Sequence, residues 1–126
     1  MARILLIETS TAQLSTALAE DGVVTAFRIC GEPRMHAALT APSVQEVLNE
    51  KGLTVKDLDA VCVGKGPGSY TGLRVGVSTA KGLCFGASLP LLSVGTLDTL
   101  VSEAHRLGVV PEGCRYIVPK IGRAHV

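Results

Sequence analysis

The stretch from Gly64 to Val77, GKGPGSYTGLRVGV, has the residue types of a phosphate-binding loop. It combines closely spaced glycines with Lys65, a serine and a threonine, and it follows an apolar run. A P-loop requires the spacing G-x-x-x-x-G-K-[ST], and dinucleotide sites require G-x-G-x-x-G. Neither spacing occurs, because Lys65 precedes most of the glycines. A strand-to-helix turn with free N–H groups could still attract an anion, so the stretch has two interpretations: a generic anion site or a packing surface.

Other residues that could support catalysis or bind a metal are isolated from one another. The four cysteines form no C-x-x-C pair, and no histidine lies near another ligand at metal spacing; these residues are Cys30, Cys62, Cys84, Cys114, His36, His105 and His125. We therefore predict no catalytic residue, no metal site and no cofactor. The cysteines are interpreted as small hydrophobic residues in a reducing compartment.

Composition excludes several classes of protein. Hydrophobic residues make up 47% of the 126 residues, and the net charge is +1 with scattered basic residues, which argues against a nucleic-acid-binding face. No apolar run approaches the ~18 residues of a membrane span. Since Met1 leads directly into a strand-like run and no signal peptide is visible, a cytoplasmic location is expected.

Hydrophobic periodicity predicts an α/β fold with the order β-β-β-α-β-α-β-α-β. Three short strands form an antiparallel meander, and βαβ units follow, which gives a mixed five-stranded sheet with helices packed on it. Pro42 either kinks the first helix or marks a first turn capped by Thr40. A capped turn is expected at Thr54–Asp57, and Thr96 is expected to cap the third helix. The predicted strands are 3–9, 14–21, 23–30, 60–64, 90–95 and 114–119, and the helices lie within 31–52, from the glycine loop to about 87, and 96–108.

The helix after the glycine loop carries glycines in its interior, each of which costs about 0.5–1 kcal/mol relative to alanine. Gly72, Gly76, Thr79 and Leu83 form one stripe, which Val75 and Gly82 widen. Such a stripe indicates that another element approaches the backbone closely. That element is either the first helix of this chain or a helix of another protein.

The segments ILLIETST (4–11), LTVKDLDAVCVGKGPGS (53–69) and GPGSYTGLRVGVSTAKGL (66–83), with YIVP at 116–119, resemble the TsaB (YeaZ) family. The resemblance implies the actin-like ATPase, or ribonuclease-H-like, fold with two subdomains. Residues 1–114 would be the first subdomain, and 115–120 would begin a truncated second one. Residues 121–126, IGRAHV, also match one reading frame of a common sequencing adapter, so we expect them to be an artefact.

The resemblance also implies a function: a non-catalytic bacterial scaffold in the threonylcarbamoylation of a tRNA adenosine beside the anticodon. The expected partners are a TsaD-type paralogue, forming a heterodimer, and a TsaE-type ATPase, with tRNA reached only through the complex and a homodimer formed by the chain alone. The first two helices would supply the interface. Its expected residues are Met35, His36, Leu39, Gly72, Val75, Gly76, Thr79 and Leu83.

Two departures from catalytic relatives favour a pseudoenzyme. The Asp-x-Gly-Thr-like phosphate turn of nucleotide-binding relatives is replaced by a vestigial turn, Glu8, Thr9, Ser10 and Thr11. We expect its hydroxyls to bond backbone N–H groups. TsaD binds metal through two histidines four residues apart, whereas here His36 is followed by Thr40, so His36 is expected to be a cap or interface residue. The alternatives are a sugar-kinase-like or actin-like ATPase and a glycoprotease-like peptidase.

Overall fold

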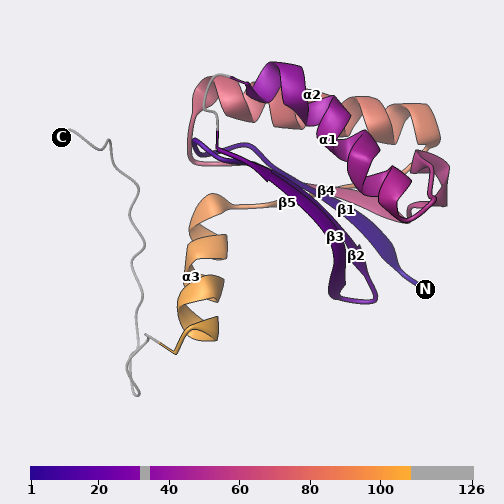
Figure 1. Ribbon diagram of the computed structural model, residues 1–126. Coiled ribbons are helices and arrows are strands. Elements are labelled where there is room, and N and C mark those ends of the chain that lie inside the picture. The colour runs from indigo at the N-terminus through magenta and orange to yellow at the C-terminus, as the bar shows by residue number, and fades with distance from the viewer. Residues whose placement is uncertain (32–34, 109–126) are drawn as a thin grey trace.

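The computed structural model describes residues 1–31 and 35–108 (Figure 1). Its elements are β1 (Arg3–Glu8), β2 (Leu14–Glu20), β3 (Val23–Cys30), α1 (His36–Glu50), η1 (Val55–Asp57), β4 (Ala60–Gly64), α2 (Tyr70–Ala87), β5 (Leu91–Val94) and α3 (Thr96–Arg106). This order agrees with the prediction through the third helix. The strand predicted at 114–119 and the expected divisions at 115–120 and 121–126 lie outside the described residues.

The strands form one mixed five-stranded sheet in the order β3-β2-β1-β4-β5, as predicted. β1 pairs antiparallel with β2, and β2 with β3, around a tight turn in which Asp21 and Gly22 both have positive φ. β4 then pairs parallel with β1, and β5 with β4. The carboxyl ends of β1, β4 and β5 therefore meet at the same edge of the sheet, where the turn after β1 and the glycine loop after β4 lie together.

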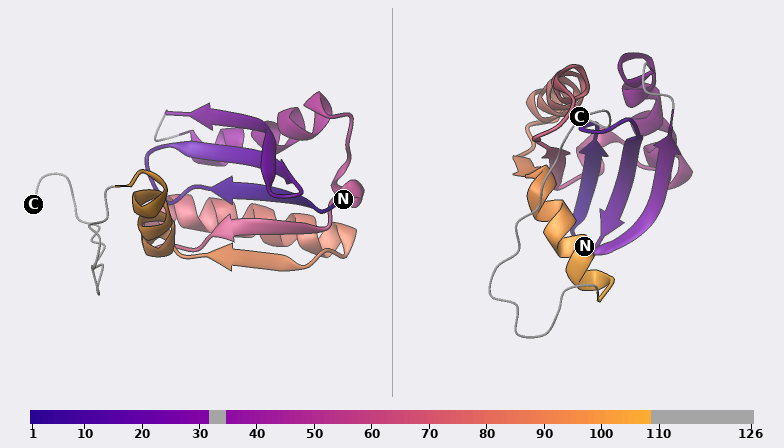
Figure 2. Two further views of the ribbon diagram at one scale, coloured as in Figure 1. Left: turned by 90° about the horizontal axis from the view of Figure 1, so that it is seen from below. Right: turned by 90° about the vertical axis from the view of Figure 1, so that its left-hand side faces the viewer.

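Helices α1 and α2 cover one face of the sheet, and the core lies between them and the strands (Figures 1 and 2). Side chains alternate along a strand, so one side of each strand faces these helices. The core residues include Leu5, Ile7, Leu18, Val61 and Val63 from the strands and Val44, Val47, Leu48, Ala80 and Cys84 from the helices. On the opposite face, Phe27 and Ile29 of β3 remain exposed. The sheet is thus apolar on both faces but covered by α1 and α2 on one.

The structure decides between the alternatives for the first helix and corrects the predicted cap of the third. α1 begins at His36, so Pro42 lies inside it, and the Thr40 hydroxyl donates to the His36 carbonyl at 2.6 Å instead of capping the helix. α3 has Gly95 as its N-cap, and Thr96 is its first, buried residue. Both threonines face the interior, which the sequence pattern alone did not reveal. The turn predicted at Thr54–Asp57 is confirmed, since η1 there has a capping box.

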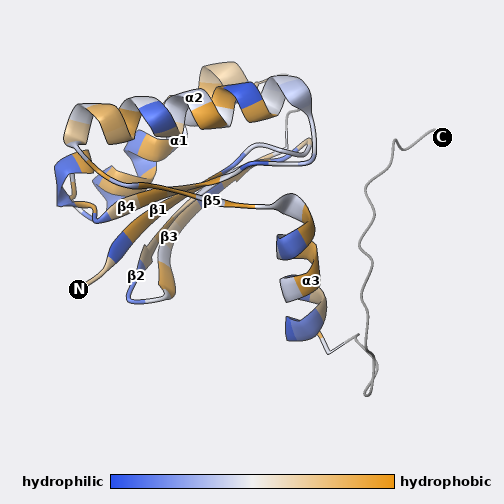
Figure 3. Cartoon of the chain, turned by 180° about the vertical axis from the view of Figure 1, so that it is seen from behind, coloured by the Kyte–Doolittle hydropathy of each residue, from blue (hydrophilic) through white to orange (hydrophobic). Residues whose placement is uncertain are grey.

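Helix α3 extends beyond the carboxyl end of β5, on the other side of the sheet from α1 and α2 (Figure 2). It is strongly amphipathic, with apolar residues along one stripe (Figure 3), and Leu100 within it and Leu107 at its C-cap are exposed. Within residues 1–31 and 35–108, every helix falls short of the length or the apolar character that crossing a membrane requires.

Candidate functional site

The side-chain carboxylate of Glu8, the last residue of β1, closes the turn that follows this strand. The Oε1 atom of Glu8 accepts a hydrogen bond from the backbone N–H of Ser10 at 2.9 Å. Thr9 and Ser10 are buried, and their hydroxyls have no hydrogen-bond partner among the described residues. The expectation that the hydroxyls of this turn satisfy backbone N–H groups is therefore wrong for Thr9 and Ser10. Only Thr11 accepts such a bond, from Gln13 at 3.3 Å.

Three glycines, each four residues from the next, bring the glycine loop and helix α2 directly against this turn. A β-carbon at Gly68 would overlap the Ser10 carbonyl, and β-carbons at Gly72 and Gly76 would overlap Thr9. The N–H of Ser69 also donates to the Ser10 carbonyl at 2.8 Å. The close approach inferred from the stripe is thus confirmed, but the element that approaches is the β1 turn of the same chain. Gly72 and Gly76 are buried in this contact, and a role for them in a partner interface stays a prediction.

His36 completes this internal junction. It is only 5% exposed, and its Nε2 atom lies 2.9 Å from the carbonyl oxygen of Thr11. Because a carbonyl only accepts, Nε2 carries the hydrogen. The ring also lies beside Gly72, where a β-carbon would be 3.4 Å from its Cδ2 atom. His36 is therefore neither a helix cap nor an exposed interface residue, and it joins the β1 turn to both helices.

No cluster of three or more His, Cys, Asp or Glu side chains could hold a metal ion within residues 1–31 and 35–108. Among the cysteines in those ranges, Cys30, Cys62 and Cys84 are free. Burial raises the pKa of the Cys62 thiol, and the nearby charge of Glu8 raises it further. Burial likewise raises the pKa of Cys84. A raised pKa disfavours the thiolate, so neither cysteine is activated as a nucleophile.

The remaining predicted interface residues lie on the outer surface of α1 and α2. Met35 is exposed, and Leu39, Val75, Thr79 and Leu83 are half-buried. A groove of about 420 Å³ lies between the helices, lined by Ala37, Thr71, Arg74, Val75, Ser78 and Thr79. Its lining is mostly small side chains, which lets another helix approach closely. Whether these five residues contact a partner stays a prediction.

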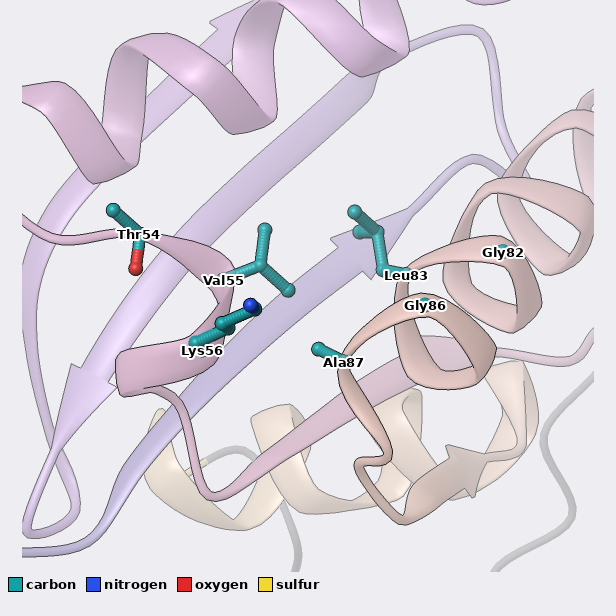
Figure 4. A pocket seen from close by; sticks show the side chains of 7 residues that line it. All are labelled: Thr54, Val55, Lys56, Gly82, Leu83, Gly86 and Ala87. Carbon is teal, nitrogen blue, oxygen red and sulfur yellow. The ribbon is translucent and has the colours of Figure 1, made fainter.

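A second groove, not predicted from the sequence, lies between η1 and the carboxyl-terminal half of α2 (Figure 4). Its volume is about 460 Å³, and its lining residues are Thr54, Val55, Lys56, Gly82, Leu83, Gly86 and Ala87. Val55 and Leu83 form its apolar floor, and the Lys56 ammonium group is its charged group. The signal in the sequence was the pair Gly82 and Gly86, one helical turn apart.

A meander extended by parallel βαβ units, with two helices on one face and a glycine-rich turn at the carboxyl edge, defines an actin-like, ribonuclease-H-like α/β protein. Here the turn that would surround a phosphate is packed against α2. A family model described as "TsaD: tRNA N6-adenosine threonylcarbamoyltransferase" matches residues 31–114. Together with the relatives described next, this match shows that the chain belongs to the TsaB (YeaZ) family.

The relatives agree in sequence and in fold. The chain is 45% identical over 105 residues to the tRNA threonylcarbamoyladenosine biosynthesis protein TsaB of Escherichia coli, covering 82% of this chain and 45% of that protein. It is 38% identical over 100 residues to the protein of the same name from Bacillus subtilis, covering 79% of this chain and 44% of that protein. The solved structure of YeaZ from Pseudomonas aeruginosa superposes with a TM-score of 0.80 at 34% identity, covering 86% of this chain and 51% of that one. The chain thus spans about half the length of these relatives.

Proposed function

We propose that this protein acts in the biosynthesis of threonylcarbamoyladenosine in tRNA, as a non-catalytic subunit that binds a TsaD-type paralogue. Relatives from Escherichia coli and Bacillus subtilis carry the name of that pathway. In the proposed complex, the TsaD-type subunit performs the transfer and a TsaE-type ATPase joins it. This protein reaches tRNA only through the complex, in the cytoplasm.

The non-catalytic role rests on one observation, the packing of the glycine loop and helix α2 onto the β1 turn. The Ser69 N–H at the amino end of α2 is bonded to the Ser10 carbonyl, and the backbone at Gly68 touches the same residue. The Glu8 carboxylate is bonded to the Ser10 N–H. In this arrangement the groups that would bind phosphate at such a turn bond one another. This supports a turn with a structural role.

The partner-binding role is supported by the outer surface of α1 and α2. One groove lies between α1 and α2 and another between η1 and α2, and both are lined largely by small or apolar residues. The only charged residues of α2 are Arg74 and Lys81. Small residues allow two helical layers to pack closely, and charged residues are depleted at the centres of interfaces. Met35, Leu39, Val75, Thr79 and Leu83 would lie in this contact.

The test is to purify the protein with and without the TsaD-type and TsaE-type proteins of the same organism. Alone, it is expected to show no ATP hydrolysis above background and no threonylcarbamoylation of tRNA. With both partners, nucleoside analysis of tRNA is expected to show the modified adenosine, and omitting this protein is expected to abolish it. ATP hydrolysis by the protein alone would favour the kinase-like alternative, and modification independent of it would refute the proposal.

A further inference from the structure

β3 is the outermost strand of the sheet that the described residues form, at the opposite side from β5 (Figure 2). It is the longest of the described strands, and Phe27 and Ile29 are exposed on it. The free edge of such a strand is a template on which another strand can pair, and apolar side chains along it favour that pairing. Arg28 is the only charged residue of β3. This strand therefore needs protection against association, and Arg28 is the residue that could supply it.

The direction of the backbone groups in β2 follows from one hydrogen bond near the hairpin. The N–H of Asp21 donates to the Ala2 carbonyl at 2.8 Å, which extends the ladder between β1 and β2 by one step. Bonded and non-bonded pairs alternate along an antiparallel ladder. Counted back from Asp21, Thr16 falls in a pair that is not bonded to β1. Thr16 therefore turns its backbone N–H and C=O toward β3.

The same alternation identifies the outward-facing groups of β3. Thr16 lies opposite Arg28, so the backbone of Arg28 is bonded to β2. The residues on either side of it, Phe27 and Ile29, then turn their N–H and C=O groups away from the sheet. These groups form the free edge of β3.

The side chain of Arg28 reaches back over this edge. Its Nη1 atom donates to the outward-facing Phe27 carbonyl at 2.8 Å. The same nitrogen lies 2.8 Å from the Oε1 atom of Glu50, and Nε lies 3.4 Å from the Oε2 atom of Glu46. We call these contacts the Arg28 clamp; they join α1 to the free edge of β3. Partly exposed ion pairs contribute little to stability, so stability alone does not account for three acceptors around one guanidinium group.

We propose that the Arg28 clamp protects the free edge of β3 against antiparallel pairing with a second copy of this chain. The clamp occupies the Phe27 carbonyl, which an added strand would need as an acceptor. This inference concerns the solubility of the chain and does not depend on the proposed function.

A second copy is the occupant that this edge fits. In a two-fold arrangement, the outward groups of Phe27 would bond those of Ile29 in the second copy, and the reverse pair would form as well. Each pair would place an aromatic side chain opposite a β-branched one, which is a favourable cross-strand contact. In the same register the two Arg28 side chains would lie directly opposite each other, and like charges in that position are destabilising. Arg28 thus opposes the one register that the edge otherwise favours.

Sedimentation velocity of the full chain over a series of concentrations tests the proposal. Arg28→Met removes the charge and the three contacts, and it is expected to strengthen self-association by roughly tenfold or more. Arg28→Lys keeps the charge, but one ammonium group lacks the planar fork of donors, so an intermediate effect is expected. Arg106→Met is the matched control, because it removes the ion pair with Glu103 on α3 and is expected to leave self-association unchanged. Thermal unfolding checks that each variant is folded.

Hydrogen exchange then shows whether the association uses the free edge. The N–H groups of Phe27 and Ile29 are expected to exchange rapidly in the monomer and to be protected in the associated form of Arg28→Met. Adding Ile29→Lys to Arg28→Met puts a charge back on this edge and is expected to reverse the gain.

Three results would refute the proposal. The first is wild-type self-association in Arg28→Met, or in Arg28→Lys if the methionine variant does not fold. The second is stronger association that leaves the N–H groups of Phe27 and Ile29 unprotected, since the contact would then lie elsewhere. The third is an equal gain in Arg106→Met, which would show that any added apolar side chain has this effect.

Discussion

A β-carbon on residue 76 would overlap the side-chain hydroxyl of Thr9, so the turn after β1 packs directly against the backbone of α2. Thr9 is fully buried, and it directly follows β1, the central strand of the sheet. The same turn meets Gly72 and Gly68, which makes the three glycines one continuous contact. The glycine-rich signature is thus explained by the packing of α2 onto β1.

Gly76→Ala and Gly72→Ala are therefore expected to destabilise the fold, because each new methyl group would overlap Thr9. Overpacking of this kind costs about 1–3 kcal/mol. Urea unfolding followed by circular dichroism gives the change in the free energy of unfolding. The sequence placed these two glycines in the expected partner interface, whereas the structure packs them against the β1 turn of the same chain.

The matched variant for that comparison is Gly82→Ala, on the same helix but with open space around its Cα. It is expected to stabilise the protein by about 0.5–1 kcal/mol, since alanine is the better helix former. Equal effects of the Gly76 and Gly82 substitutions on unfolding would contradict the contact with Thr9.

Most of the fold followed from periodicity and turn chemistry, and most of the errors fall where the β1 turn meets α2. Strand alternation and the capping box at Thr54 are local signals, and both predicted what the structure has. The burial of His36 and Gly72 depends on where the β1 turn meets α2, two segments about 60 residues apart in the chain. A helical stripe shows that some element approaches closely, but not which one. The sequence placed Gly82 beside the same stripe, whereas the structure leaves open space around it.

His36→Ala is expected to destabilise the protein by about 1–3 kcal/mol, because it leaves the Thr11 carbonyl without its donor and opens space beside Gly72. His36→Gln places an amide N–H near the lost donor and should restore part of this loss. Urea unfolding measures both variants. Metal analysis of the purified wild type and His36→Ala is expected to show no difference, and a stoichiometric metal lost in the variant would contradict a structural role.

Glu20 is expected to contribute to acid unfolding. The Thr25 hydroxyl donates to it at 2.8 Å and lowers its pKa; burial opposes this shift, while Arg3 and Lys51 add to it. Since the folded-state pKa is the lower one, the stabilisation is fully present above the unfolded value of about 4.3 and is lost as pH falls through the folded value. Glu20→Gln should therefore flatten the decline of the unfolding free energy below that pH. Thr25→Val should flatten it partly, and an unchanged slope in both variants would argue against this linkage.

Loss of an apolar side chain is expected to lower the unfolding free energy on one face of the sheet and to leave it nearly unchanged on the other. Leu5 is fully buried under α1 and α2, so Leu5→Ala should cost about 2–5 kcal/mol through lost transfer energy and a cavity. Phe27 is 59% exposed on the opposite face of β3, an edge strand whose only charged residue is Arg28. Phe27→Thr should leave the unfolding free energy nearly unchanged while reducing self-association, because exposed apolar edges promote aggregation. Light scattering and urea unfolding of both variants decide this, and a large loss of stability in Phe27→Thr would mean that the outer face is covered by another element.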